Sequence, residues 1–186
     1  MTSYCETAPG HQVHAPYHDS EYGFPVDDES VLFERLTLEI FQAGLSWLII
    51  LKKRPAFALA FENFKVDRVA AFDATDIERL LNDPLIIRNR RKIEATIHNA
   101  KVVQELRHSH GGFGQWIEAH HPMSRMEWCK LFRSTFAFMG KEVVGEFLMS
   151  IGYLPGAHTV QCPIYRRIAE SGPAWMRNPG RTGDAD

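Results

Sequence analysis

The stretch DESVLFERLTLEIFQAG, residues 28–44, indicates the fold class of this sequence. Apolar residues recur in it every three or four positions, the spacing of one face of an α-helix. These residues are Leu32, Leu36, Ile40 and Ala43. Gly44 follows them, and glycine is a common residue just past the end of a helix. The stretch therefore predicts a helix that begins after Asp28 and turns one face toward a core.

Glu39 lies on the same apolar stripe, three residues after Leu36 and four before Ala43. A buried carboxylate is costly unless it finds hydrogen bonds, a counter-charge or a ligand. Backbone amides or an arginine would satisfy it in an ordinary core, whereas a ligand would make it part of a site. The sequence by itself leaves both interpretations open.

The rest of the chain also has helical patterns, and convincing strand alternation is absent. Leu45 to Lys53 predicts a short buried helix that Pro55 stops. Residues 75–78 and 124–127 fit the capping box at a helix start. Further helices are expected over 92–107, 124–136 and 141–151. We predict an all-α fold with one compact domain over residues 1–177 and a disordered polar tail over 178–186.

The composition of the chain excludes several classes of protein. The chain has 186 residues, of which 45% are hydrophobic and 24% charged, as in a globular domain. Its net charge is −2, so any nucleic-acid site must be a local patch. No apolar run approaches the roughly 18 residues of a membrane helix, and the N-terminus lacks a secretory pattern. Three cysteines, an odd number, favour a reduced cytoplasmic protein without a membrane partner.

Two cysteines and two histidines form a possible metal set near the two ends of the sequence. Cys5 and His18 lie at one end, and His158 and Cys162 lie at the other. Two Cys and two His suit tetrahedral zinc, but these spacings also arise by chance. Cys129 lies in an apolar helical pattern and is expected to be a packed thiol.

Two segments are candidates for phosphate binding. Asn89 is expected to cap a helix whose first turn carries Arg90, Arg91 and Lys92, although cations there oppose the helix dipole. A nearby phosphate would explain them, and so would a solvated basic turn. The hairpin around Gly140 offers backbone N–H groups in the same way, but an ordinary helical hairpin has the same pattern.

Aromatic residues accompany these features. Tyr17, Tyr22 and Trp47 flank His18 and Glu39 in the sequence. Aromatic planes beside a buried acid suit a flat polar or cationic heterocycle, and they suit an ordinary core equally well.

Together, five segments resemble the DNA-3-methyladenine glycosylase I family of alkylation-repair enzymes. They are Cys5 near the start, YHDSEYG (17–23), LEIFQAGLSW (38–47) continuing to LKKR (51–54), IIRNRRKI (86–93) and HTVQC (158–162). The resemblance extends in order over about residues 5–162, and the QAGLSW block is its most specific part.

The resemblance implies a helix–hairpin–helix DNA glycosylase fold whose terminal segments are joined by one structural zinc ion. Its ligands would be Cys5, His18, His158 and Cys162. The implied enzyme is a monofunctional DNA N-glycosylase, acting as a monomer on double-stranded DNA that contains alkylated purines. It flips out and excises N3-methyladenine and leaves an abasic site, without strand cleavage.

The resemblance also implies roles for individual residues. Glu39 would be the catalytic residue, through a hydrogen bond to the flipped base. The base-binding residues would be Tyr17, Tyr22, Trp47, Gln42 and Ser46. The DNA-binding residues would be Leu85, Ile86, Ile87, Arg88, Arg90, Arg91, Lys92, Gly140 and Lys141.

Three departures from the family pattern concern specificity. Thr7 and Tyr22 stand where the family usually has Trp, and the segment 141–150 lacks the usual hydroxyl residues and introduces Glu142. These changes keep two alternatives open on the same scaffold: a non-catalytic protein that binds lesions or DNA structures, and a glycosylase with altered base specificity.

Overall fold

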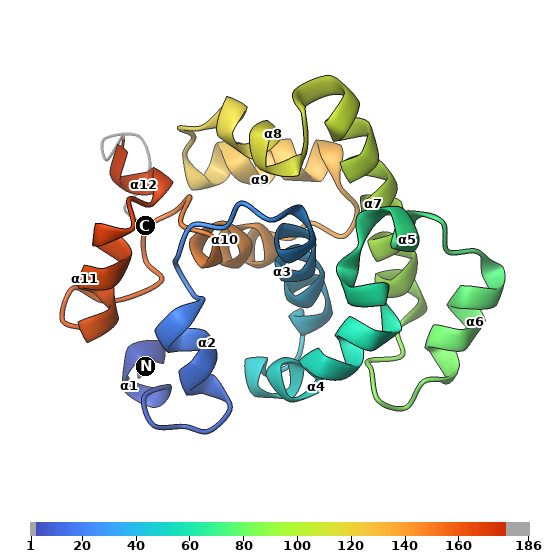
Figure 1. The fold of residues 1–186 in the computed structure, drawn as a ribbon, viewed down its shortest axis with the longest axis horizontal. Helices are drawn as coiled ribbons and strands as arrows, with labels where there is room; N and C mark the ends of the chain where they lie inside the picture. The colour runs from blue at the N-terminus through green and yellow to red at the C-terminus, as the bar shows by residue number, and fades with distance from the viewer. Residues whose placement is uncertain (1–2, 178–186) are drawn as a thin grey trace.

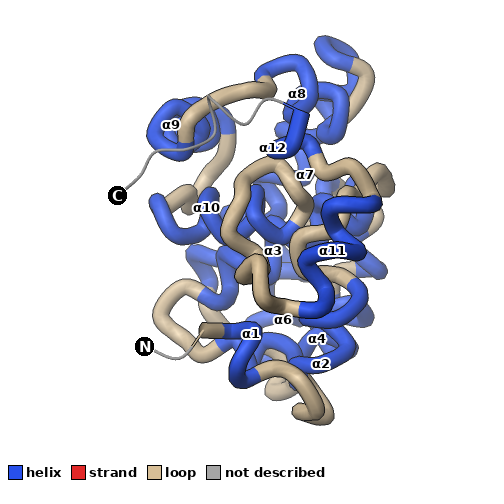
Figure 2. Tube along the Cα trace, turned by 90° about the vertical axis from the view of Figure 1, so that its left-hand side faces the viewer, coloured by secondary structure: helices blue, strands red, loops and turns tan. Residues whose placement is uncertain are grey.

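The computed structural model describes residues 3–177, and every regular element in that part of the chain is helical (Figures 1 and 2). The elements are α1 (Tyr4–Thr7), α2 (His14–Ser20), α3 (Glu29–Gln42), α4 (Trp47–Ala60), η1 (Glu62–Phe64), α5 (Val66–Ala70), α6 (Ala74–Asn82), α7 (Arg90–His110), α8 (Phe113–His120), α9 (Arg125–Thr135), α10 (Lys141–Ser150), α11 (Pro163–Glu170) and α12 (Ala174–Arg177). The predicted all-α class is confirmed. The expectation for 178–186 lies outside the described residues.

Helix α3 lies at the centre of the molecule, with α10 beside it and α4 and α7 around it (Figure 1). Asp28 caps its start, where its side chain accepts a hydrogen bond of 3.0 Å from the Val31 N–H. Its end is marked by Gly44, whose φ of +87° is a left-handed conformation that favours glycine. The predicted helix is confirmed at both ends, and its central position buries residues on nearly every side, Glu39 included.

The prediction that Pro55 stops the following helix is wrong. Helix α4 runs from Trp47 to Ala60 with Pro55 inside it. The Pro55 ring is exposed, while Phe57 and Ala60 after it are buried in the core. Packing of this second half therefore offsets the hydrogen bond that the proline removes.

Lys52–Arg54 consequently lie in the middle of α4, and two of these residues, Lys53 and Arg54, make long-range contacts. Arg54 pairs with Glu21 and Glu34 at 2.8 Å each. The Lys53 ammonium donates to the Leu85 carbonyl at 2.7 Å and so fixes the turn before α7.

One of the two predicted capping boxes is displaced. Ser124 and Glu127 form the box at the start of α9 as predicted. Helix α6 begins two residues earlier than expected, because Asp73 accepts from the N–H groups of Thr75 and Asp76. Asp is as good an N-cap as Thr, so the local pattern contained two competing starts.

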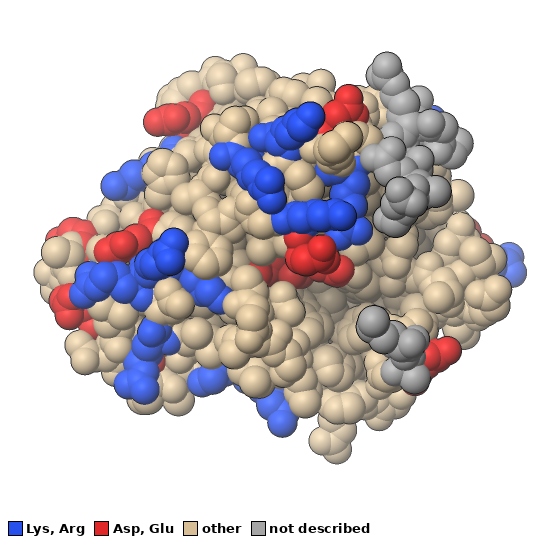
Figure 3. Space-filling view, turned by 180° about the vertical axis from the view of Figure 1, so that it is seen from behind, with Lys and Arg blue, Asp and Glu red and all other residues tan. Residues whose placement is uncertain are grey.

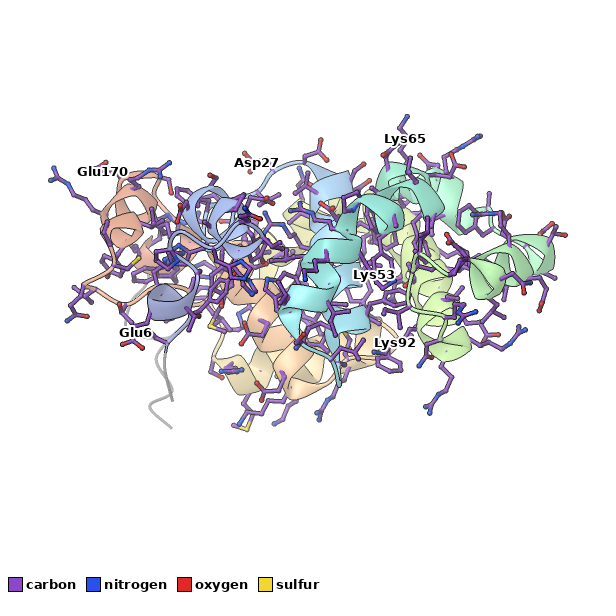
Figure 4. All side chains as sticks on the ribbon, turned by 90° about the horizontal axis from the view of Figure 1, so that it is seen from below. Glu6, Asp27, Lys53, Lys65, Lys92 and Glu170 are labelled. Atoms are coloured by element: carbon purple, nitrogen blue, oxygen red, sulfur yellow. The ribbon has the colours of Figure 1, made fainter. Side chains whose placement is uncertain are left out.

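The prediction that Lys92 lies at the DNA surface is wrong. Asn89 caps α7 as expected, accepting from the Lys92 N–H at 3.2 Å, but the Lys92 side chain is buried. Its ammonium donates to the carbonyls of Phe41 and Ala43 at 2.9 and 2.7 Å. Figure 4 shows Lys92 among the helices, whereas Lys65 projects from the periphery. The cation thus caps the C-terminal end of α3 instead of binding a phosphate.

The two ends of the described chain lie side by side: α1 and α2 are adjacent to α11 (Figures 1 and 2). The Arg167 guanidinium donates to the Asp19 carbonyl across this junction at 3.0 Å. Gly23 is required here, since a Cβ at this position would lie 2.9 Å from the Cβ of Ala157. Among residues 3–177, no helix is both long and apolar enough to cross a membrane.

The Lys92 cap leads to a stability prediction. Lys92→Met removes the donor from two helix-end carbonyls and should lower the free energy of unfolding by about 1–3 kcal/mol. Urea titration measures this change, and Lys101→Met, an exposed position on the same helix, is the matched control. Equal stability of the two variants would contradict the assigned role of Lys92.

Candidate active site and metal centre

A cavity of about 600 Å³ opens between α1, α2, α3, α4 and α10. Its lining combines aromatic rings with carboxyl groups and contains no lysine or arginine among the described residues. The lining residues are Tyr4, Tyr17, Tyr22, Glu39, Gln42, Ala43, Gly44, Trp47, Glu142, Val143 and Glu146. A concave site of this size is suited to a small flat molecule.

Glu39 supplies the buried acid of the cavity. It is 5% exposed, and no described residue hydrogen-bonds its carboxyl group. Burial raises the pKa of the Glu39 carboxyl well above its ordinary value; the nearby Glu146 raises it further, and Arg35 opposes the shift. In an ordinary core, hydrogen bonds from neighbouring residues would satisfy this carboxyl group. Among the described residues these hydrogen bonds are missing, and the Glu39 carboxyl group lines the cavity free to bind a ligand.

Tyrosine and tryptophan rings form an aromatic wall of the same cavity. The Tyr17 and Trp47 rings meet edge to face with centroids 5.1 Å apart, and the Tyr17 and Tyr22 rings lie 5.6 Å apart. Tyr4 packs edge-on against Tyr22 at 5.7 Å. These pairs hold one another in fixed orientations and leave aromatic surface facing the cavity.

An ion-pair network behind this wall fixes α2 against α3 and α4. The Arg35 guanidinium lies 4.8 Å from the Tyr17 ring centroid and pairs with Glu21 at 2.7 Å. Glu21 also accepts from Arg54, which in turn pairs with Glu34. Arg35 is 3% exposed, so its charge is compensated by Glu21 and by the Tyr17 ring, and it stays outside the cavity lining.

The four residues of the candidate metal set meet at the junction of the chain ends. The ligand atoms of Cys5, His18, His158 and Cys162 all lie within 4.8 Å of one another. The Cys162 Sγ is 3.3 Å from the His158 Nδ1 and 3.7 Å from the His18 Nε2. Zinc bonds of about 2.0–2.3 Å in a tetrahedron separate neighbouring ligand atoms by about 3.3–3.8 Å, a range that includes both of these Cys162 distances.

The second nitrogen of each histidine ring is also engaged in the manner of a metal ligand. The His18 Nδ1 lies 2.7 Å from the Asp19 carboxylate, and the His158 Nε2 lies 2.9 Å from the Tyr22 carbonyl. Such contacts orient the ring so that the other nitrogen faces the metal. The cluster can bind a metal ion, and through Tyr22 it adjoins the wall of the cavity.

The basic segment before α7 divides into exposed and buried residues. Arg88, Arg90 and Arg91 are exposed, and Leu85 is 62% exposed at the tip of the turn. Ile87 is half-buried. Ile86 was expected beside them at the DNA surface, but it is 2% exposed and belongs to the core. Leu85 and Ile86 thus differ in exposure although they are neighbours in the chain, because Ile86 packs into the core.

The hairpin between α9 and α10 is held in place by α7. The Ala137 N–H donates to the Asn99 Oδ1 at 2.8 Å, and the Asn99 Nδ2 donates to the Ala137 carbonyl at 3.2 Å. Gly140 is the N-cap of α10, with open space beside its Cα, and Lys141 after it is exposed. Lys and Arg side chains gather on this side of the molecule beside a compact acidic group (Figure 3). Basic side chains thus cluster locally despite the net charge of −2.

The structure brings together most of the predicted base-binding residues, with one exception. Gln42 lines the cavity and donates to the Leu45 carbonyl at 2.9 Å. Ser46 is outside the lining, because it is the exposed N-cap of α4. Thr7 is exposed on α1 and does not reach the cavity, whereas Tyr4 of the same helix supplies an aromatic ring to it.

Six lining residues were not predicted to bind the base: Tyr4, Ala43, Gly44, Glu142, Val143 and Glu146. Glu146 follows Val143 by three residues and precedes Phe147 on the apolar pattern of α10. A carboxylate in an apolar helical pattern was the signal that identified Glu39, and the same signal was available for Glu146.

Comparisons with known proteins agree with this arrangement. Residues 7–129 match the family model described as methyladenine glycosylase. The chain is 32% identical over 182 residues to the DNA-3-methyladenine glycosylase of Haemophilus influenzae, covering 88% of this chain and 98% of that protein. It is 33% identical over 168 residues to DNA-3-methyladenine glycosylase 1 of Escherichia coli, covering 80% and 89%.

Solved structures give the same result. The 3-methyladenine DNA glycosylase I of Staphylococcus aureus superposes with a TM-score of 0.78 at 31% identity, over 87% of this chain and 95% of that one. A variant of 3-methyladenine DNA glycosylase I in complex with 3-methyladenine superposes with a TM-score of 0.79 at 30% identity, over 88% and 97%. The resemblance predicted from the sequence is confirmed, and this chain belongs to the methyladenine glycosylase family.

Proposed function

We propose that this protein excises N3-methyladenine from alkylated DNA and leaves an abasic site. The observation that carries the proposal is the Glu39 carboxyl, buried and without a hydrogen-bond partner among residues 3–177, at an aromatic cavity of purine-compatible size. The named relatives act on or bind 3-methyladenine, which supports the same base for this chain.

The cavity suits a base that has been flipped out of the double helix. Tyr17, Tyr22 and Trp47 offer surface for stacking, which contributes about 1–3 kcal/mol per base in other proteins. Glu39 is available to accept a hydrogen bond from the 6-amino group of adenine. Flipping costs a few kcal/mol and is least costly for damaged pairs, so the cavity selects among bases that already unstack easily.

Once the base is bound, its excision requires no nucleophilic side chain from the protein. N3-methylated adenine in DNA carries a positive charge and is a good leaving group, so water attacks C1′ as the glycosidic bond breaks. Stabilisation of the departing base by Glu39 lowers the barrier. No lysine lines the cavity among the described residues, so no side chain there forms an imine, and strand cleavage is not expected.

DNA binding is assigned to the surface formed by the turn before α7 and the hairpin before α10. Arg88 and Arg91 are exposed and make no ion pair with any residue in 3–177, and the N-terminus of α10 is free to receive a phosphate. Leu85 is the side chain proposed to enter the gap left by the base, because it is exposed on a turn fixed by Lys53 and Asp83.

We further propose one structural zinc ion at Cys5, His18, His158 and Cys162. Four protein ligands leave no position for water, so the metal stabilises the fold and activates no nucleophile. A DNA substrate and reduced cysteines support a cytoplasmic location, and we propose that the protein acts as a monomer.

The direct test is incubation of the purified protein with DNA treated with a methylating agent, followed by chromatography of the released bases. We expect free 3-methyladenine and intact, heat-labile abasic DNA. A gel shift on methylated DNA without any released base would replace the proposed activity by lesion binding.

Glu39→Gln tests the assigned contact. The variant keeps the size of the side chain but loses the charge that stabilises the departing base, so the single-turnover excision rate should fall at least about tenfold. Glu105→Gln, an exposed carboxyl on α7, is the matched control and should retain the wild-type rate. Full activity of Glu39→Gln would remove Glu39 from the mechanism.

The raised pKa of Glu39 also predicts a pH dependence of stability. The folded protein holds the Glu39 proton more tightly than the unfolded chain, in which a Glu pKa is about 4.3. Above that pH the folded state binds more protons than the unfolded state, so this group lowers stability as the pH rises. Relative to wild type, Glu39→Gln should therefore gain free energy of unfolding as the pH rises above about 4.3. A difference that is independent of pH in urea titrations would contradict the buried carboxyl.

Removal of one ligand tests the metal proposal. Cys162→Ser should lose most of the bound zinc and more than about 3 kcal/mol of stability, because structural zinc binding contributes directly to folding. Metal analysis and thermal melting measure the two effects. Cys129→Ser, the cysteine outside the cluster, should keep one zinc per chain. A full zinc content in Cys162→Ser would refute the ligand set.

A further inference from the structure

Glu146 is a second acid in the candidate base cavity. It comes from α10 and lines the cavity beside Tyr22, while Glu39 comes from α3, which packs against α10. The Tyr22 hydroxyl donates to the Glu146 Oε2 at 3.0 Å, which fixes the carboxyl group. This hydrogen bond leaves the second oxygen of Glu146 available to a ligand.

The cavity lining is negative and has no cation of its own among the described residues. It contains three carboxyl groups, from Glu39, Glu142 and Glu146. Arg35 pairs with Glu21, and the Arg125 guanidinium lies 3.5 Å from the exposed Glu142. A cationic ligand in the cavity would therefore meet several carboxyl groups and no lining cation.

The two buried acids also act on each other. Burial raises the pKa of Glu146, an effect that the Tyr22 hydrogen bond and the Arg125 charge oppose, and Glu146 in turn raises the pKa of Glu39. Like charges in a poorly solvated cavity repel, and a cation between them removes this repulsion. The arrangement favours a positively charged occupant over a neutral one of the same shape.

Glu146 also lies outside the part of the chain that matches the family model, which ends at residue 129. Its place in the same cavity lining as Glu39 comes from the structure of this chain.

We propose that Glu146, held by the Tyr22 hydroxyl, is a second base-contacting carboxylate that selects N-alkylated purines by their positive charge. The inference rests on the proposed function for the identity of the bound base. It adds that the substrate class is defined by charge as well as shape, with Glu39 and Glu146 both contacting one cationic purine.

The test uses free purines, so that it does not depend on turnover. 3,9-Dimethyladeninium is a cation that mimics the alkylated base while it is still attached to a sugar, and 9-methyladenine is its neutral counterpart. Binding to the wild-type protein is followed by quenching of tryptophan fluorescence, since Trp47 lines the cavity. We expect the wild type to bind the cation more tightly than the neutral purine.

Glu146→Gln removes the charge and keeps the size of the side chain. It should weaken binding of 3,9-dimethyladeninium by about tenfold, the loss expected for one charge-assisted hydrogen bond, and leave 9-methyladenine binding unchanged. Glu105→Gln is the matched control for the loss of one negative charge and should behave as wild type. Unchanged cation binding in Glu146→Gln, or an equal loss for both purines, would overturn the proposal.

Tyr22→Phe provides a second, independent variant in case Glu146→Gln fails to fold. It removes the hydroxyl that fixes Glu146 and should weaken cation binding by less than Glu146→Gln does, and the double variant should bind no more weakly than Glu146→Gln alone. Additive losses would show that Tyr22 and Glu146 act separately. Absence of base release by the wild type would reject the proposed function and leave this binding result intact.

Discussion

The contact of the Lys92 ammonium with the carbonyls of Phe41 and Ala43 joins the end of α3 to the start of α7, and both parts of the candidate site depend on it. On one side of the contact, α3 carries Glu39 into the cavity. On the other side, α7 begins with exposed arginines, and farther along its Asn99 fixes the hairpin. One buried cation thus sets the distance between the surface assigned to DNA and the cavity assigned to the base.

The cavity itself is unfavourable for folding and favourable for binding. A buried carboxyl without a partner lowers stability, and a second one nearby increases the cost. The surrounding structure offsets this cost through the core, the ion pairs that surround Arg35 and Arg54, and the junction of the chain ends. Local disagreement with the rules of packing is common at functional sites, where the ligand supplies the missing interaction.

Sequence patterns predicted what depends on local spacing or on recognisable motifs. The bounds of α3 and the place of Glu39 on its buried face followed from local spacing. The meeting of Cys5 with Cys162 was implied by the family resemblance, because the spacing of these residues left it open. Long-range packing decided the rest. Pro55 is tolerated because Phe57 is buried, and Lys92 turns inward because α3 ends beside it. Glu146 and Glu39 meet at one cavity only when α10 packs on α3, although each acid had a visible pattern of its own.

The most direct test of the central claim, that the cavity between α3 and the aromatic wall receives the alkylated base, is a crystal structure of the protein with 3-methyladenine. The account predicts the base stacked against the Tyr17 and Trp47 wall, with its 6-amino group within hydrogen-bond distance of the Glu39 carboxyl. Electron density for the base at another site, with the Glu39 carboxyl uncontacted, would contradict it.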